Sequence, residues 1–474
     1  MMIGREKERK RLLDAAQEEE SRFVAVYGRR RVGKTYLVRE TFSRQFAFEH
    51  TGSASGTMGD QLASFCNSLR AHGLKDCRNV RSWIEAFEEL KRLIDARRDG
   101  KKIIFIDELP WMDTPKSRFL PAFENFWNGW ASARKDILLI VCGSATSWLL
   151  DRVIRSRGGL HNRVTHRIHL KPFTLRECEA YAASRRLRLN RAQVAEYYMA
   201  FGGVAYYWSV IEKGESAAQA INRLYFSSDG ELRGEFNELY RSLFRHPEPY
   251  MRIVETLGRR KSGLSRSEIA ARAAPDDSGH LTGYLDELEE CGFIRKYVCY
   301  GKSRRDALYQ LIDNFTLFHF SFCERQRTKG RNYWLTSLDA PEHVVWSGLA
   351  FERLCLEHVD EIKTALGVGG VQTETFAWRG ETPTGKGVQI DLIIDRRDGV
   401  VNLCEMKYST KPYVMTKREA ESLTDRRWAL KESVGLRKAL HLTLVSPAGI
   451  VDNAQSADVQ KVIVLDDLFR EVLA

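Results

Sequence analysis

The strongest constraint on the fold is a glycine-rich octapeptide, Gly-Arg-Arg-Arg-Val-Gly-Lys-Thr, at residues 28–35. It follows a short apolar run at residues 22–27 and precedes a segment of helical character. Strand, loop and helix in this order match the phosphate-binding pattern G-x-x-x-x-G-K-T, whose backbone N–H groups surround phosphate oxygens. The sequence therefore predicts an ATP site on a parallel α/β sheet. A chance match in a surface loop is the alternative.

Within this loop, two side chains have distinct expected roles. We expect Lys34 to reach the β and γ phosphate oxygens and the Thr35 hydroxyl to bind Mg²⁺. The remaining loop positions and the next helical residue would contact the nucleotide: these are Gly28, Arg29, Arg30, Arg31, Val32, Gly33 and Tyr36.

Polar residues also follow two further apolar runs. The run at residues 103–106 ends at Asp107 and Glu108, which we expect to hold the Mg²⁺ shell and to polarise the attacking water, respectively. An exposed acidic strand end is the alternative. The run at residues 137–142 is followed by Ser144, whose hydroxyl could contact the γ-phosphate, although a serine after a strand also serves as a helix cap.

A chain of 474 residues is too long for one hydrophobic core, so we expect several modules. Apolar strands alternate with helical segments as far as the third run, which predicts a parallel sheet covered on both faces. Later segments read as helices alone, then as three short helices with a strand pair, and finally as helices followed by strands. The predicted domains are a P-loop ATPase core (residues 1–174), a helical lid (175–234), a winged helix (235–314) and an α/β domain (315–474).

The last domain contains a second group of reactive residues. Asp391 lies in a predicted strand at residues 388–394, and Glu405 and Lys407 share one face of the next strand. A hairpin could bring Asp391 beside them. Two carboxylates that hold Mg²⁺ and a lysine that positions water are the groups a phosphodiesterase needs. The alternative is that these carboxylates only pair with neighbouring basic residues.

The formal charge of +11 indicates either a polyanionic partner, DNA or RNA, or simple solubility. In the predicted winged helix, residues 280–290 would face a major groove, with Lys302, Arg304 and Arg305 in a basic turn. Three further basic residues stand at positions 259–261. The third helix is nevertheless acidic, so a protein-facing role is the rival interpretation.

The nine scattered cysteines form no Cys-x-x-Cys pair, which argues against a disulfide framework and a zinc site. The apolar runs are far shorter than the roughly 20 residues that a membrane span needs. We therefore expect a cytoplasmic protein without a membrane partner. The tryptophans that flank the apolar strands, at positions 111, 127, 130 and 148, are expected in the core or an interface.

Four motifs in order carry a resemblance to a known family. Ile-Gly-Arg-Glu at residues 3–6, the glycine-rich loop, IIFIDELPW at 103–111 and CGSATSW at 142–148 together resemble archaeal-type ATPases of the AAA+/STAND group. The resemblance covers about the first half of the chain and implies that Gly4 and Arg5 lie near the adenine. It also implies that Arg163 is an arginine finger, which allows a homo-oligomer; a surface arginine is the alternative.

The C-terminal pattern resembles the restriction-endonuclease-like, or PD-(D/E)XK, superfamily. That resemblance implies that Glu352 joins Asp391 and Glu405 as a metal ligand, although Ile390 stands where the superfamily's proline is found. Two functions are therefore expected. ATP hydrolysis either controls a Mg²⁺-dependent cut in nucleic acid or drives a signalling switch or transcription regulator whose C-terminal domain is inactive.

Overall fold

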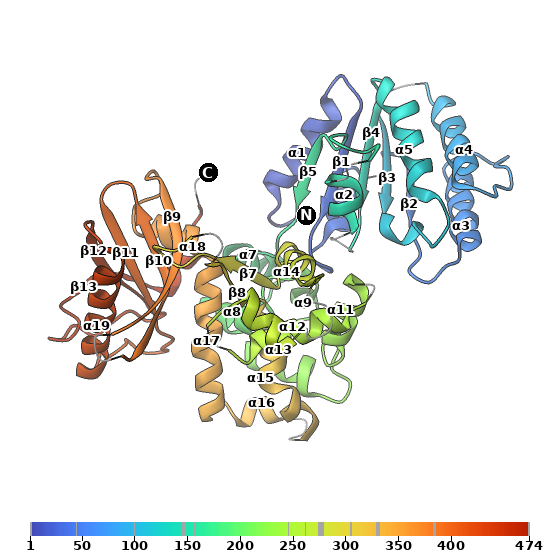
Figure 1. Ribbon diagram of the computed structural model, residues 1–474. Coiled ribbons are helices and arrows are strands. Elements are labelled where there is room, and N and C mark those ends of the chain that lie inside the picture. The colour runs from blue at the N-terminus through green and yellow to red at the C-terminus, as the bar shows by residue number, and fades with distance from the viewer. Residues whose placement is uncertain are drawn as a thin grey trace. The chain divides into compact units, whose positions relative to one another are not determined.

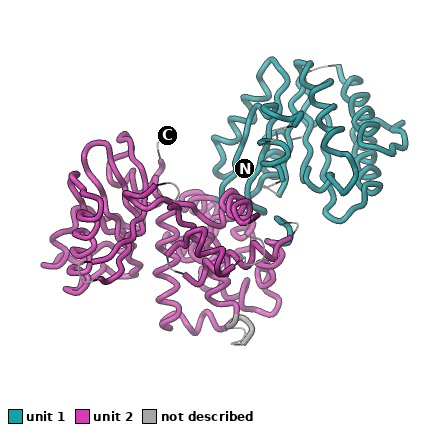
Figure 2. The backbone as a smooth tube through the Cα atoms, viewed as in Figure 1, with its two compact units in different colours: residues 1–172, 241–245 teal, residues 173–240, 246–474 magenta. Residues whose placement is uncertain are grey.

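The computed structural model describes residues 2–43, 45–98, 100–144, 148–155, 158–244, 246–260, 262–273, 279–303, 306–328, 332–382 and 385–472. The chain divides into two compact units, residues 1–172 with 241–245 and residues 173–240 with 246–474 (Figure 2). Across the described ranges, no helix is both long enough and apolar enough to span a bilayer.

The first unit is built on a sheet of five parallel strands in the order β2-β3-β4-β1-β5 (Figure 1). The strands are β1 (Arg22–Tyr27), β2 (Phe46–Thr51), β3 (Lys102–Asp107), β4 (Ile137–Cys142) and β5 (His166–His169). The three central strands, β1, β3 and β4, are those predicted from apolar runs. The outer strands β2 and β5 were not predicted, because charged or histidine residues interrupt the apolar pattern of each.

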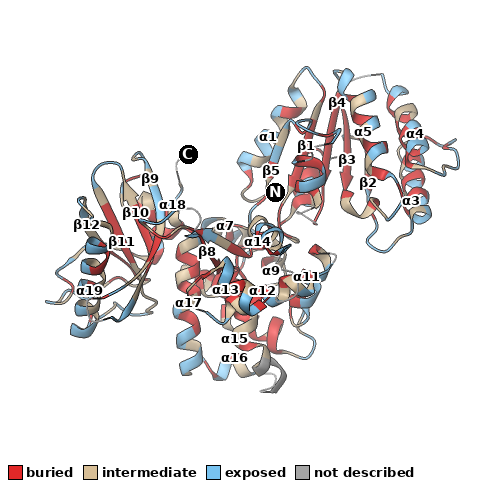
Figure 3. Cartoon of the chain, viewed as in Figure 1, coloured by how far each residue is buried: buried red, intermediate tan, exposed pale blue. Residues whose placement is uncertain are grey.

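Helices cover both faces of this sheet. They are α1 (Glu6–Gln17), α2 (Lys34–Thr41), α3 (Met58–Ala71), α4 (Trp83–Asp95) and α5 (Phe119–Gly129), with shorter turns η1 (Leu109–Met112), η2 (Ala131–Ala133) and η3 (Leu149–Ile154). One core cluster joins α3, α4 and α5 to the sheet, and a second joins α1 and α2. The strands between the two clusters are buried, as a sheet covered on both sides requires (Figure 3).

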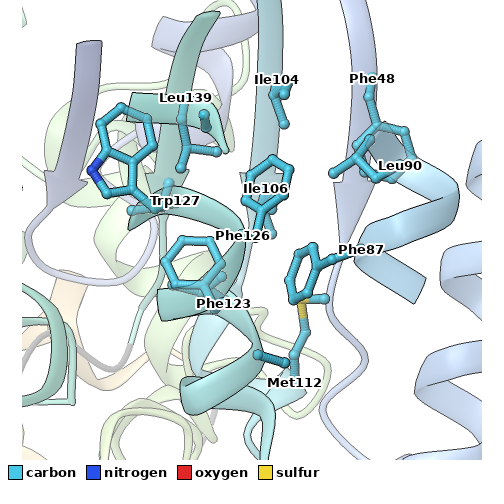
Figure 4. Close-up of a cluster of buried hydrophobic side chains, with 14 of the residues drawn as sticks. Phe48, Phe87, Leu90, Ile104, Ile106, Met112, Phe123, Phe126, Trp127 and Leu139 are labelled. Carbon is cyan, nitrogen blue, oxygen red and sulfur yellow. The ribbon is translucent and has the colours of Figure 1, made fainter. Parts of the chain in front are cut away.

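The larger core cluster is rich in aromatic rings. Phe87 and Phe126 stack with ring centroids 5.1 Å apart, close to Ile106 of β3 (Figure 4). Trp127 is buried, and Trp130 and Trp148 pack against the same cluster. The predicted core position is confirmed for Trp127, Trp130 and Trp148, whereas Trp111 is half-buried and lies outside this cluster.

The second unit begins with helices, as predicted. They are α7 (Leu175–Ser184), α8 (Arg191–Phe201), α9 (Ala205–Ser209), α10 (Ala217–Ile221) and η4 (Asn222–Phe226). The helix α11 (Glu235–Leu243) follows, and its last three residues belong to the first unit. The next elements are α12 (Glu248–Gly258), β6 (Leu264–Ser265), α13 (Arg266–Ala273), α14 (Leu281–Glu290), β7 (Ile294–Tyr297) and β8 (Leu308–Leu311). The three strands pair antiparallel in the order β6-β8-β7.

Four helices lead to a second five-stranded sheet, ordered β13-β12-β11-β10-β9. The helices are α15 (Asn314–Thr328), α16 (Tyr333–Thr336), α17 (Pro341–Glu357) and α18 (Val359–Ala365). The remaining elements are β9 (Thr373–Glu381), β10 (Gly387–Arg396), β11 (Val400–Met406), α19 (Lys417–Val434), β12 (Ala439–Val445), β13 (Val459–Ile463) and η6 (Leu465–Phe469). Strands β9, β10 and β11 form an antiparallel meander, whereas β11, β12 and β13 are parallel.

The hairpin predicted between β10 and β11 is confirmed. The helix α19, which packs on this sheet through Leu423, Ala429 and Leu430, was not predicted.

Candidate functional site

The glycine-rich loop connects β1 to α2, and two of its glycines are required by geometry. Gly28 has φ 138°, and a Cβ added there would stand 2.3 Å from the Leu170 carbonyl oxygen. Gly33 has φ 96° and immediately precedes the first turn of α2. Both conformations are costly for any other residue. The backbone therefore keeps the shape that directs the N–H groups at the start of α2 toward the loop, where an anion binds favourably.

Lys34 is buried at the start of α2 and is held by the loop itself. Its ammonium group donates hydrogen bonds to the carbonyl oxygens of Gly28, at 2.9 Å, and Arg29, at 3.0 Å. The charge is thus concentrated inside the loop. Phosphate oxygens are stronger acceptors than peptide carbonyls, so this side chain is placed to exchange its partners for a polyphosphate.

The Asp107 carboxylate links three elements at the ends of the central strands. Its Oδ2 accepts a hydrogen bond of 2.7 Å from the Thr35 hydroxyl, and its Oδ1 accepts one of 2.9 Å from the Glu108 N–H. The Cys142 thiol also donates to Oδ1. Burial raises the pKa of Cys142 well above its ordinary value, and the charge of Asp107 raises it further, so the thiol keeps its proton. The carboxylate is fixed with Oδ2 directed at Thr35.

Thr35 and Asp107 supply the hard oxygen atoms that Mg²⁺ prefers. This ion binds proteins through one or two such groups and takes its other ligands from water and phosphate. The hydroxyl and the carboxylate are already 2.7 Å apart. The residues present therefore fit a Mg²⁺ ion bound together with a nucleotide.

Glu108 adopts an unusual backbone conformation, with φ 49°, directly after β3. Its Oε2 accepts hydrogen bonds from the Ser144 N–H, at 3.0 Å, and the Ser144 hydroxyl, at 2.8 Å. The two residues predicted to act near the γ-phosphate are therefore in contact. Strained non-glycine backbone is typical of functional sites. Residues 145–147 of the same predicted segment lie outside the described residues.

The other predicted nucleotide contacts are spread around the loop. Gly4 has φ 65°, and Arg5 is buried just before α1. Arg29 is buried, Arg30 and Arg31 are half-buried, and Tyr36 is 52% exposed. Arg163 is exposed in a turn in which its N–H donates to the Leu160 carbonyl. An exposed position suits a residue that acts on a neighbouring subunit.

The C-terminal candidates lie on adjacent strands. Leu392 pairs with Cys404, so Asp391 and Glu405 are the next residues beyond that pair. The pairing of β10 with β9 is irregular between Ile390 and Ile393, which puts Asp391 in a bulge. Bulges occur often beside active sites because they redirect a side chain.

Basic partners surround Glu405. Its carboxylate accepts a 2.8 Å hydrogen bond from Arg426 of α19 and lies 3.2 Å from the Lys407 ammonium. Lys407 also stands 3.9 Å from the carboxylate of Glu419. The predicted Glu405–Lys407 proximity is therefore present, but as an ion pair.

Glu352 lies in α17 and has a basic partner of its own. It forms an ion pair with Arg353, while burial and the charge of Asp391 raise its pKa to about 7. In the described part of the chain, no three His, Cys, Asp or Glu side chains gather as a metal would require. Glu352, Asp391 and Glu405 thus do not form one three-carboxylate group.

The helix α14 carries an acidic surface, as the sequence indicated. Asp286 is exposed, and Glu287 accepts a hydrogen bond from the Tyr250 hydroxyl. Lys302 in the turn between β7 and β8 is exposed. Lys261, Arg304 and Arg305 lie outside the described residues.

Two contacts at the sites were missed from the sequence. Cys142 touches Asp107 because β3 and β4 are parallel neighbours in which Ile106 pairs with Val141. Asp107 and Cys142 each end an apolar run, and the ends of parallel neighbouring strands lie at one edge of the sheet, so this contact could have been predicted from the sequence. Arg426 was missed because the helix that carries it was not predicted.

Comparisons with known proteins agree with this geometry. Residues 2–207 match the model of a family described as an ATPase domain predominantly from Archaea. The uncharacterized protein MJECL04 of Methanocaldococcus jannaschii is 26% identical over 335 residues, which are 68% of this chain and 69% of that protein.

Two solved structures are also similar. The Walker-type ATPase PABY2304 of Pyrococcus abyssi has a TM-score of 0.50 and 18% identity, over 67% of this chain and 96% of that one. The ORC2 protein of Aeropyrum pernix, solved in ADPNP–ADP complexes, has a TM-score of 0.42 and 13% identity, over 69% and 95% of the two chains. The family match and the loop geometry agree: residues 2–207 of this chain are similar to an ATPase domain found predominantly in Archaea.

Proposed function

We propose that this chain binds ATP with Mg²⁺ at the loop between β1 and α2 and hydrolyses it. The observation that carries the proposal is the Thr35–Asp107 hydrogen bond of 2.7 Å, because it joins the two predicted Mg²⁺ ligands. Bound Mg²⁺ would supply positive charge to the phosphate oxygens. Lys34 would leave the loop carbonyls for the β and γ oxygens, and Glu108 would polarise the attacking water.

Three further residues complete the proposed nucleotide site. Gly4 and Arg5 would border the adenine, and Ser144 would contact the γ-phosphate and release Glu108 toward the water. The shared hydrogen bonds of Ser144 and Glu108 support this coupling, because one hydroxyl cannot donate to both the carboxylate and a phosphate.

The ATPase is tested with Lys34→Ala, and the chain offers a matched control. The Lys101 ammonium also donates to backbone carbonyls, those of Glu18, Glu20 and Lys135, but outside the loop. ATP turnover should fall about 100-fold or more in Lys34→Ala. It should stay near the wild-type rate in Lys101→Ala. Turnover retained in Lys34→Ala would overturn the site assignment.

For the second unit, we propose a winged helix from α12 to β8 and a nuclease-like domain after it. The order helix, strand, helix, helix, strand, strand supports the winged helix. The bulge at Asp391 beside Glu405 supports a nuclease-like site for DNA or RNA that ATP turnover controls.

The nuclease is tested with linear, circular and single-stranded DNA and with RNA, with Mg²⁺ or Mn²⁺, with and without ATP. An Asp391→Ala variant is the control. Cleavage that Asp391→Ala removes would establish the nuclease and show whether ATP gates it. Cleavage that persists in Asp391→Ala would place the activity elsewhere.

A second function is favoured by one observation. Glu405 is already neutralised by Arg426 and Lys407, a pairing that suits a domain retained for binding. In this alternative the chain is a nucleotide-driven switch or transcription regulator. Absence of cleavage on every substrate, together with ATP-dependent changes in nucleic-acid or protein binding, would favour it.

A further inference from the structure

A cavity of about 610 Å³ lies inside the second unit, between β7, α18 and the strands β9 and β10. Three of its lining residues are basic, Arg295, Lys296 and Lys363. Ligand pockets in proteins commonly have volumes of roughly 300 to 1,000 Å³. The cavity is therefore large enough for a nucleotide unit.

Arg295 is the unusual member of this lining. Its Nε donates to the Gln310 side chain at 2.8 Å, its guanidinium lies 4.5 Å from the centre of the Tyr297 ring, and its Nη2 stands 3.4 Å from the Asp391 carbonyl oxygen. Among the described residues, no carboxylate lies within ion-pair distance of it. Burial lowers the pKa of Arg295 to about 10 and the like charge of Arg353 adds to the effect, whereas the negative charges of Asp391 and Glu352 act in the opposite direction. The half-buried Arg295 guanidinium thus has no carboxylate of the described residues in direct contact, and a bound anion would stabilise its charge.

The acidic residues that line the cavity, Asp360 and Glu289, form no ion pair with Arg295. The Asp360 carboxylate lies 3.3 Å from Lys363. Glu289 accepts a hydrogen bond of 3.3 Å from the Lys296 N–H, and burial raises its pKa, which weakens its negative charge. An anion in the cavity would therefore be the first negatively charged group in direct contact with Arg295.

The neighbouring groups narrow the class of ligand. Tyr297 and Phe376 also line the cavity, and aromatic rings stack on nucleobases. The planar guanidinium matches phosphate oxygens in a two-point contact. The bond from Arg295 to the Asp391 carbonyl places this anion site directly beside the proposed nuclease-like residue.

We propose that this cavity binds the phosphate of a nucleotide unit, with Arg295 as the principal anion contact and Lys363 as a secondary one. The inference deepens the proposed function, on which it rests for the choice of nucleic acid as the ligand. Arg295 is a binding residue here. It would hold a nucleic-acid strand next to Asp391 whether or not that nucleic acid is cut.

The test measures binding without ATP or metal, so that it is independent of hydrolysis and cleavage. A fluorescent single-stranded DNA with a 5′-phosphate is titrated in EDTA against wild type, Arg295→Met, Lys363→Met and Arg437→Met. Arg437 is exposed and does not line the cavity. We expect Kd to rise about tenfold in Arg295→Met, because a hydrogen-bonded charge contact is lost. It should rise less in Lys363→Met and stay unchanged in Arg437→Met.

Thermal unfolding with inorganic phosphate or a mononucleotide provides the second arm. Both should raise the Tm of wild type more than that of Arg295→Met. If these small ligands stabilise wild type selectively but the DNA does not bind, the anion site stands and its ligand is a free nucleotide. Equal Kd values and equal Tm shifts in all four proteins would overturn the proposal. If Arg295→Met fails to fold, the proposal is still tested by the other two variants: Kd should rise in Lys363→Met and stay unchanged in Arg437→Met.

Discussion

The Thr35 hydroxyl donates a 2.7 Å hydrogen bond to Asp107 Oδ2, which connects the first turn of α2 to the end of β3. The two residues are 72 positions apart in the sequence, yet their side chains are in contact before any nucleotide or Mg²⁺ is bound. The opposite oxygen of Asp107 is held by Cys142 and by the Glu108 N–H. The proposed Mg²⁺ site is therefore preorganised, which reduces the reorganisation needed when nucleotide binds.

Thr35→Ala should weaken the Mg²⁺ dependence of ATP hydrolysis, because it removes the hydroxyl from this pair. The Mg²⁺ concentration that gives half-maximal turnover should rise on the order of 10-fold to 100-fold. Thr35→Ser, which keeps the hydroxyl, is the matched control and should remain near wild type. Identical Mg²⁺ curves for the alanine and serine variants would remove Thr35 from the metal site.

Glu108→Gln should separate nucleotide binding from hydrolysis. The amide preserves the shape of the side chain but cannot accept a proton, so turnover should fall about 100-fold while the Kd for ATP changes little. Ser144→Ala keeps the backbone N–H donor to Glu108 and should reduce turnover less. Both are measured by single-turnover hydrolysis and by binding of a fluorescent nucleotide. A larger loss in Ser144→Ala than in Glu108→Gln would reverse the assigned roles.

The predicted finger Arg163 allows a test of oligomeric action. Arg163→Ala should leave ATP binding intact and slow turnover by up to about 1,000-fold. Mixing Arg163→Ala with Lys34→Ala should restore turnover, because one variant keeps an intact loop and the other keeps the arginine. Restoration requires that the arginine act on a neighbouring subunit. Unchanged turnover in Arg163→Ala alone would show that this exposed residue has no such role.

The two loop glycines should differ in their effects on stability. Gly28→Ala combines a positive φ with a Cβ only 2.3 Å from a backbone oxygen, whereas Gly33→Ala has no heavy atom within 4 Å of the added carbon. We expect Gly33→Ala to lose about 1 to 2 kcal/mol of unfolding free energy and Gly28→Ala to lose more. Urea unfolding of the two variants measures the difference. Equal losses would mean that the loop moves away from Leu170 without cost.

The sequence predicted those parts of the fold that depend on local patterns. Buried apolar runs located β1, β3 and β4, and the spacing of Gly28, Gly33 and Lys34 located the loop between strand and helix. The strand β5 and the helix α19 were missed because their apolar signal is weak. Only Ile168 is buried among the four residues of β5, and three residues are buried among the 18 of α19.

The contacts in the two candidate sites also divide into those that local sequence patterns predict and those that depend on packing. The Thr35–Asp107 and Glu108–Ser144 contacts join motif residues and were foreseeable, because parallel strands end at one edge of the sheet. The pairing of Glu405 with Arg426 depends on how α19 packs on the sheet, and the position of Arg295 beside Asp391 depends on packing between two sheets. Neither is encoded in a local pattern.

Stability of the second unit should depend on pH through His358. The ring is buried; its Nε2 accepts a hydrogen bond of 3.0 Å from the Leu175 N–H, and its Nδ1 lies 2.8 Å from the Leu354 carbonyl oxygen. Because Nε2 must remain an acceptor, only the neutral ring fits, and burial lowers the pKa of His358 from 6.5 to about 4. Between these two values the unfolded chain binds the proton more readily than the folded chain. The contribution of neutral His358 to the free energy of unfolding is therefore complete above pH 6.5. It is lost as the pH falls toward 4, and the total loss is about 3 kcal/mol.

Other buried groups change the stability in the opposite direction over the same pH range, so the effect of His358 is isolated by comparing wild type with a variant that lacks the ring. Burial raises the pKa of Glu361 to about 7, and that group stabilises the fold as the pH falls. His358→Gln does not titrate, and its amide oxygen can accept the Leu175 N–H. The unfolding free energy of wild type should therefore fall more steeply between pH 6.5 and 4 than that of His358→Gln, in urea titrations at matched ionic strength. Parallel curves for the two proteins would contradict the prediction, because they would mean that protonation of His358 does not destabilise the folded chain.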